Sequence, residues 1–141
     1  MAPVGVDSKE DILLTEYSGK RMLPLVVEVV VTDEFAAWYE GLDDSDSDAV
    51  QKHVDLLGEK GVALRFPYQS FLTGSKRSLR ELRVQSRGRP IRIAYGFDPK
   101  RQAVVVLGAD KTGDDRFYEW FISEADRLWE VYLEETGQEG K

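Results

Sequence analysis

The residues best suited to chemistry lie between Lys76 and Tyr118, where an otherwise acidic chain becomes basic. Residues 62–101 contain ten Lys and Arg against two Asp and Glu, a net charge of +8. The net charge of residues 1–61 is −9 and that of residues 102–141 is −6, so the whole 141-residue chain has a net charge of −7. This concentration of cations in a chain of pI about 4.8 indicates a positive site for a phosphate, a polyanion or an acidic partner segment.

Arg92 is the first candidate, because the residues around it alternate as in a β-strand. Alternation places Arg92 on one face with Ala94 and Gly96, whose small size predicts an open surface. A substrate lying across that surface would meet a guanidinium, whose planar fork matches a phosphate group. The alternative is that Arg92 simply pairs with Glu81 or Asp110.

Three further candidates, Lys111, Arg116 and Tyr118, follow the next strand pattern. If their loop curls beside Arg92, the site gains cations, a phenol and carboxylates without any histidine. Such a set suits cleavage of RNA by its own 2′-hydroxyl group. One group takes that proton, another donates one to the leaving 5′-oxygen, and cations stabilise charge on the phosphate. The alternative for Tyr118 is burial within the apolar stripe of a helix.

Other kinds of site are excluded by composition or spacing. The chain has no cysteine and a single histidine, His53, so neither a disulfide framework nor a structural zinc site is expected. Asp44, Asp46 and Asp48 have the spacing of calcium ligands, but Ala49 stands where a calcium loop needs glycine. We therefore expect no metal and no small-molecule cofactor.

A cytoplasmic protein is expected from the absence of targeting patterns. The longest apolar stretch, residues 23–31, is broken by Pro24 and Glu28 and is too short to cross a bilayer. Residues 1–10 lack the basic start and apolar centre of a secretory signal.

We predict that one α+β domain, residues 23–136, positions these candidates. An extension over residues 1–22 precedes it and a tail over 137–141 follows it. We expect a mainly antiparallel sheet of about four strands, two N-terminal helices and a long C-terminal helix. In chain order these are a strand at 25–31, a helix from the caps Thr32 and Asp33 to Leu42, a helix at 49–60, strands at 78–84, 91–97 and 103–107, and a helix at 114–135. Residues 62–75 are expected to form an irregular connection, and a short helix over 9–17 is the alternative reading of the extension.

Six short motifs stand in a fixed order between residues 25 and 133. They are Phe35-x-x-Trp38, Leu72-Thr-Gly-Ser75, Glu81-Leu-Arg83, Arg92-Ile-Ala-Tyr-Gly-Phe-Asp-Pro99, Gly108-Ala-Asp-Lys-Thr-Gly-Asp-Asp-Arg-Phe-Tyr118 and Ala125-Asp-x-Leu128. Together they resemble the RelE/HigB superfamily of bacterial toxins, in particular its phage-derived Gp49-like branch. The resemblance implies a RelE-like fold.

The resemblance also implies a function: the toxin of a type II toxin–antitoxin pair, which cleaves mRNA in the ribosomal decoding site. A cognate antitoxin, usually a helix-turn-helix protein like HigA, would hold it inactive. In such toxins an arginine of the middle strand and a tyrosine of the last helix serve the scissile phosphate, and the matching positions here are Arg92 and Tyr118. Lys111 and Arg116 match the charged loop, with Asp110 and Asp114 as weaker acid or base candidates. RNA binding is expected of Arg80 and Arg83, which alternation places on opposite faces, and of the other cations in the basic segment, Lys76, Arg77, Arg87 and Arg89.

Two other functions stay open at this point. A toxin of the ParE type would share the fold and inhibit DNA gyrase without RNA chemistry. An inert remnant would still bind an antitoxin but cut nothing.

Overall fold

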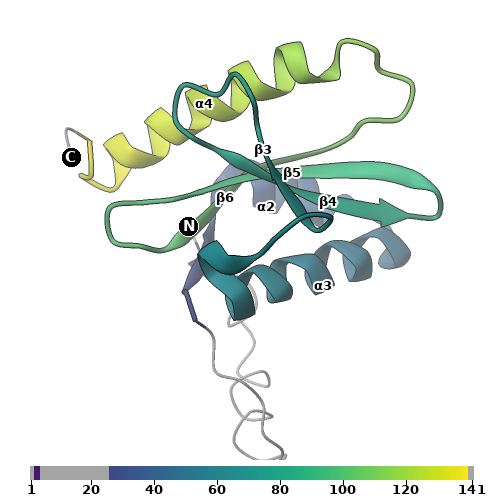
Figure 1. Cartoon of the computed structure of the whole chain (residues 1–141), viewed down its shortest axis with the longest axis horizontal. Coiled ribbons are helices and arrows are strands. Elements are labelled where there is room, and N and C mark those ends of the chain that lie inside the picture. The colour runs from purple at the N-terminus through teal and green to yellow at the C-terminus, as the bar shows by residue number, and fades with distance from the viewer. Residues whose placement is uncertain (1, 4–25, 140–141) are drawn as a thin grey trace, which may run out of the picture.

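A single β-sheet separates two layers of helix in the computed structural model, which describes residues 2–3 and 26–139 (Figure 1). The sheet has six strands in the order β1-β2-β6-β5-β4-β3. The strands are β1 (Ala2–Pro3), β2 (Val29–Val31), β3 (Gln69–Phe71), β4 (Arg80–Ser86), β5 (Arg89–Phe97) and β6 (Ala103–Asp110). The helices are α2 (Asp33–Glu40), α3 (Asp44–Lys60), the short 3-10 helix η1 (Gly61–Ala63) and α4 (Phe117–Glu135).

The α+β class, the order of the main elements and the mainly antiparallel sheet are confirmed, while the strand count is not. Six strands stand where about four were expected. One of the extra strands, β3, lies in the segment 62–75 that was expected to be irregular. Three residues are too few to show a periodicity, and β3 is a strand because it pairs with β4. The one parallel pair among the described strands joins β2 to β6.

The helix boundaries shift by a few residues from the prediction. Helix α3 begins at Asp44, because the side chain of Asp43 accepts a hydrogen bond of 2.9 Å from the backbone N–H of Asp46. Helix α4 begins at Phe117, three residues later than expected. The possible helix at 9–17 lies outside the described residues, and so does most of the proposed extension over 1–22. The domain boundaries and the RelE-like fold stay predictions.

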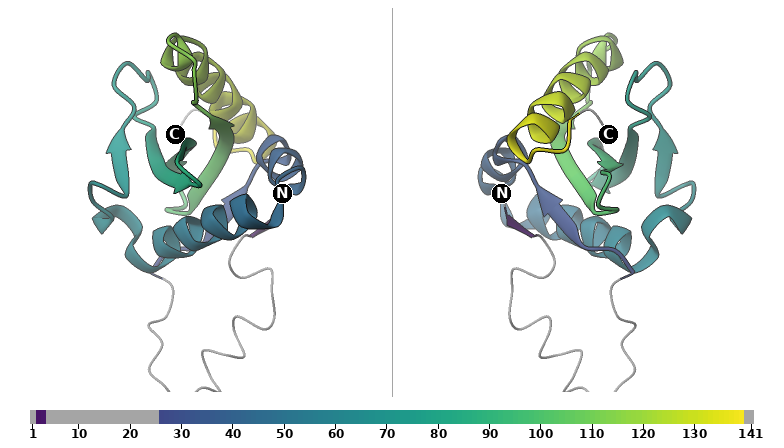
Figure 2. Two further views of the ribbon diagram at one scale, coloured as in Figure 1. Left: turned by 90° about the vertical axis from the view of Figure 1, so that its right-hand side faces the viewer. Right: turned by 90° about the vertical axis from the view of Figure 1, so that its left-hand side faces the viewer.

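Strand alternation distributes the apolar residues to both faces of the sheet. Figure 2 shows α4 over one face and α2 and α3 along the other. The α3 face buries Phe35, Val50, Val54 and Leu57 against Leu82, Ile93 and Tyr95. The α4 face buries Leu79, Ala94 and Val104 against Phe117, Phe121, Leu128 and Trp129. Each large side chain buried in this way contributes about 1.5–3 kcal/mol.

The face shared by Arg92, Ala94 and Gly96 is filled, so the prediction of an open surface is wrong. A Cβ atom built on Gly96 would lie 2.7 Å from Cδ2 of Leu79 and 3.0 Å from Cζ3 of Trp129. The small residues of β5 therefore make room for the apolar stripe of α4 rather than for a substrate. In the described part of the chain, no helix is long and apolar enough to span a membrane.

Candidate functional site

A buried polar cluster interrupts the apolar packing where the first turn of α4 crosses β4 and β5. It consists of Ser70, Glu81, Arg83, Arg92 and Tyr118, and we call it the Glu81 cluster. The strand register explains its composition, since Arg83 pairs with Arg92 and Ser70 pairs with Glu81. Paired residues of antiparallel strands point to the same face, so four of the five side chains emerge together beneath α4.

Glu81 is the centre of this cluster, with only 3% of its surface exposed. Its Oε1 atom accepts a hydrogen bond of 2.8 Å from the hydroxyl of Tyr118. Its Oε2 atom accepts one of 2.6 Å from Ser70 and one of 3.3 Å from Nη1 of Arg83. Nε of Arg92 lies 3.8 Å from Oε1. A carboxylate buried this deeply is tolerated because both oxygens are bonded and two guanidinium groups balance its charge.

Arg92 is itself 5% exposed and is bound by other groups of the protein. Its Nε donates a hydrogen bond of 3.3 Å to the hydroxyl of Tyr118, and its Nη1 donates one of 3.1 Å to the carbonyl of Ile91. Of the two partners considered from the sequence, the structure pairs Arg92 with Glu81 and leaves Asp110 to Arg89.

The ring and the hydroxyl group of Tyr118 do different things, so the ring packs in the helix stripe while the catalytic role stays a prediction. The half-buried ring meets Phe117 edge-on, with centroids 5.0 Å apart, while the hydroxyl bonds Glu81 and Arg92. Burial and the hydrogen bond to Glu81 raise the pKa of Tyr118 above its usual value, against an opposing effect of Arg92. The phenol therefore keeps its proton at neutral pH and can donate it.

The loop after β6 brings one of its two candidate cations to the cluster. Nζ of Lys111 lies 5.8 Å from the centroid of the Tyr118 ring. The side chain of Arg116 is 81% exposed, and its Nε lies 3.7 Å from Oε2 of Glu119 on the outer side of α4. Asp114 accepts hydrogen bonds from the Arg116 backbone and from the Trp120 indole.

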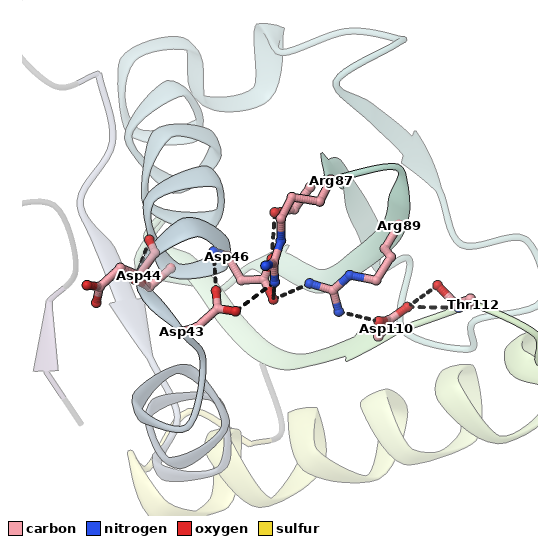
Figure 3. A network of polar contacts seen from close by, with 9 residues as sticks. Asp43, Asp44, Asp46, Arg87, Arg89, Asp110 and Thr112 are labelled. Carbon is pink, nitrogen blue, oxygen red and sulfur yellow. Dashed lines mark hydrogen bonds and ion pairs between the residues drawn. The ribbon is translucent and has the colours of Figure 1, made fainter.

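A second polar network joins the start of α3 to the β4–β5 hairpin (Figure 3). Asp46 is 5% exposed, accepts a hydrogen bond of 2.6 Å from Ser86 and forms an ion pair with Arg89. Arg89 also bonds Asp110 at 2.8 Å, and Arg87 bonds Asp43 at 2.6 Å. The Ser86 hydrogen bond, followed by the bond from Arg89, lowers the pKa of Asp46.

The remaining basic candidates lie in two other places. In the β3–β4 connection, the backbone N–H of Lys76 bonds Asp126 of α4 at 2.9 Å, and Arg77 forms an ion pair with Glu130. Arg80 lies on the α3 face of the sheet, opposite Arg83, as alternation predicted. The structure thus gathers Arg83, Arg92, Lys111 and Tyr118, and it places Lys76, Arg77, Arg80, Arg87, Arg89 and Arg116 elsewhere.

Sequence reasoning did not place Glu81 or Ser70 among the candidate site residues. For Glu81 a signal existed, since it shares a strand face with Arg83 two residues later. For Ser70 there was none, because β3 shows no pattern of its own. Among residues 2–3 and 26–139, no group of three or more acidic, histidine or cysteine side chains is arranged to hold a metal ion.

Comparison with known proteins gives this cluster a family context. Residues 37–130 match the family model described as phage-derived protein Gp49-like. A Mycobacterium tuberculosis protein named as a toxin, HigB2, is 32% identical over 108 residues, which are 75% of this chain and 53% of that protein. A second, named as the toxin HigB3, is 34% identical over 107 residues, 74% of this chain and 92% of that protein. The chain thus spans about half the length of the first relative and most of the second. It belongs to the Gp49-like family, within the RelE/HigB superfamily.

Proposed function

We propose that this protein is the toxin of a type II toxin–antitoxin system and that it cleaves mRNA on the ribosome, in the cytoplasm. Membership of the Gp49-like family and the names of the two relatives support the toxin class. The observation that carries the chemistry is the hydrogen-bonded set formed by Glu81, Arg92 and Tyr118. The proposed partners are a ribosome with its mRNA and a cognate antitoxin of the HigA-like helix-turn-helix type.

The charge of the cluster suits a phosphate. Arg83, Arg92 and Lys111 gather around Tyr118, while Glu81 is the carboxylate bonded at the centre of the cluster. A site with more cations than anions, shielded from water by α4, stabilises the extra negative charge of a pentacoordinate phosphate far better than bulk water does.

The proton transfers can be assigned to two groups of the cluster. In the proposed reaction the 2′-oxygen attacks the adjacent phosphorus while the bond from phosphorus to the 5′-oxygen breaks. The products are a 2′,3′-cyclic phosphate and a 5′-hydroxyl end. The Glu81 carboxylate takes the proton of the 2′-hydroxyl. Tyr118, whose raised pKa keeps it protonated, gives its proton to the leaving 5′-oxygen.

The burial of Arg92 and Glu81 sets a condition on this mechanism. At 5% and 3% exposure, neither side chain can meet a phosphate until Tyr118 exchanges its bond to Glu81 for one to RNA. Hydrogen bonds of a catalytic site commonly reach their productive geometry only when the substrate is bound. The same burial favours the inert, antitoxin-binding alternative, in which the cluster serves only to hold α4 on the sheet.

Expression in cells separates these functions. The protein is produced from a tight promoter, alone and with the neighbouring small open reading frame, and the 5′ ends of cellular mRNA are mapped. We expect growth arrest and new 5′ ends within translated regions, both suppressed by the neighbour. The double variant Arg92→Ala/Tyr118→Phe should remove both effects, while Arg116→Ala, which changes an exposed cation outside the cluster, should retain them.

Other outcomes point to other functions. Arrest with intact transcripts and a DNA-damage response would support the gyrase-type alternative, and no arrest would support the inert one. Full toxicity of a folded Arg92→Ala/Tyr118→Phe protein would overturn the site assignment.

A further inference from the structure

The edge of the sheet at β3 carries aromatic side chains that face solvent. Phe66, Tyr68 and Phe71 are 69%, 49% and 63% exposed, and all three fall within six residues of the chain. Exposing several large rings together is unfavourable in water, so a concentration of them in and just before an edge strand marks a contact surface.

Arginine side chains support two of these rings from one side. Cζ of Arg80 lies 4.8 Å from the ring centroid of Phe71 and 5.2 Å from that of Phe97, so the guanidinium is shared by both rings. Cζ of Arg83 lies 5.5 Å from the ring centroid of Phe66. A cation on one face holds a ring in place and leaves its other face available. The rings of Phe66 and Phe71 are therefore ordered, each with an arginine on one face, and we call these two rings the platforms.

The groove beside the platforms is positive. It is lined by Val62, Ala63, Leu64, Arg65, Phe66, Gln69, Phe71 and Arg80, a set with two arginines and no carboxylate. Gln69 is 7% exposed, and its Oε1 atom has no hydrogen-bond partner among the described residues. Positive charge, open ring faces and an unpaired amide oxygen favour an anionic ligand that carries both flat rings and hydrogen-bond donors.

The platforms are connected directly to the Glu81 cluster. Arg83 approaches the Phe66 ring and also donates a hydrogen bond of 3.3 Å to Glu81. Ser70, which stands between Gln69 and Phe71 in β3, donates one of 2.6 Å to the same carboxylate. Phe71 pairs with Arg80 and therefore points to the α3 face, whereas Ser70 and Glu81 point to the α4 face. A strand of nucleic acid with a phosphate at the cluster would thus have one neighbouring base beside Phe66 and would pass over the β3 edge to bring another to Phe71.

We infer that Phe66 and Phe71 stack on bases of single-stranded RNA that flank the phosphate held at the Glu81 cluster. Base stacking on aromatic side chains is tolerant of sequence, because every base has a flat face. The inference rests on the proposed function for the choice of RNA and for the position of the phosphate. It adds a binding surface outside the reacting groups.

A tryptophan at position 71 tests this contact by itself. Purified Phe71→Trp protein is titrated with a 12-nucleotide RNA of mixed sequence, and its fluorescence is compared with that of the unsubstituted protein treated identically. Stacking of a base on the new indole should quench the additional fluorescence. The RNA affinity of this variant, measured by anisotropy, should equal or exceed that of the unsubstituted protein.

Leucine substitutions separate stacking from general apolar contact. Phe66→Leu and Phe71→Leu keep apolar area but lose the flat face, and each should weaken RNA binding by about 5- to 100-fold. Val26→Ala removes exposed apolar area at a position that does not line the groove and should leave the affinity unchanged. Circular dichroism of every variant confirms that it is folded.

Two results would overturn the inference. One is the absence of quenching up to the solubility limit of the RNA. The other is unchanged RNA affinity in the leucine variants. If those variants also fail to bind a co-expressed antitoxin, the groove would be assigned to a protein partner. A triple variant, Phe71→Trp with Arg92→Ala/Tyr118→Phe, distinguishes failure of the stacking inference from failure of the proposed function. Its fluorescence should still be quenched by RNA even if the protein cuts no RNA.

Discussion

The hydroxyl of Tyr118 donates a hydrogen bond of 2.8 Å to Oε1 of Glu81, although the two residues are 37 positions apart in the chain. This bond joins the first turn of α4 to β4 within the Glu81 cluster. It links stability and the proposed chemistry, because the group that anchors the helix is also the proposed proton donor.

Removal of that hydroxyl should affect activity much more than stability. Tyr118→Phe keeps the ring packed on Phe117 but leaves the buried Oε1 of Glu81 without its hydrogen-bond donor, so we expect a loss of about 1–3 kcal/mol in the free energy of unfolding. Cleavage of ribosome-bound mRNA should fall by about 10²- to 10⁴-fold. Urea unfolding and a cleavage assay measure the two effects. Tyr68→Phe, at an exposed position, is the matched control, and equal activity of the two variants would contradict the proton-donor role.

Removal of the central carboxylate should destabilise the fold itself. Glu81→Ala leaves the buried guanidinium of Arg92 without its carboxylate partner, at a cost of about 3–5 kcal/mol. Glu81→Gln retains hydrogen-bonding groups and should cost less, yet it should abolish cleavage because an amide cannot take up the proton. The double variant Glu81→Leu/Arg92→Met removes both charges and should recover much of the lost stability in urea unfolding. A double variant no more stable than Glu81→Ala would show that the unpaired charge is not the cause.

The Asp46 network should make the protein sensitive to acid. Because hydrogen bonds from Ser86 and Arg89 lower the pKa of folded Asp46, its charged form stabilises the fold above the unfolded pKa, near 3.8. That stabilisation is lost as the pH falls through the lower folded pKa. Asp46→Asn should therefore be less stable than the unsubstituted protein at neutral pH, and the difference should shrink on acidification. Thermal unfolding across this range tests the prediction, with the exposed Asp48→Asn on the same helix as control.

Cations inside and outside the cluster should behave differently in RNA binding. Lys111→Ala should weaken binding and reduce the slope of log affinity against log salt concentration by about 1. Arg89 is already shared by Asp46 and Asp110, so Arg89→Ala should lower the thermal unfolding temperature and change RNA affinity little. Anisotropy titrations at several salt concentrations, with melting curves for each protein, measure both effects. A larger loss of affinity in Arg89→Ala would instead place the hairpin on the RNA.

Local patterns were sufficient for the main elements of this fold. The apolar stripe between residues 117 and 133 predicted α4, and alternation around Arg92 placed Ile93 and Tyr95 on the opposite face, where the α3 layer buries them. These features depend on residues close together in the chain, whose periodicity appears in the sequence itself. Strand β3 could not be predicted, because its three residues become a strand only through pairing with β4.

The family, the α+β class and the residue types available for a metal-free phosphate site can all be recognised from the order of the residues. The same order shows that Arg83 and Arg92 are strand residues. Which cations come together depends on the tertiary fold. Ten lysines and arginines between residues 62 and 101 suggested one positive site, but strand alternation, the hairpin and the approach of α4 divide them among several places.

A charged side chain interacts with the groups that lie near it in space. Asp46 lies 43 positions from Arg89, and Glu81 lies 37 positions from Tyr118. Whether a guanidinium is bound to a carboxylate or left for a substrate depends on which strands pair and which helix covers them. The separation of two residues along the chain does not reveal this.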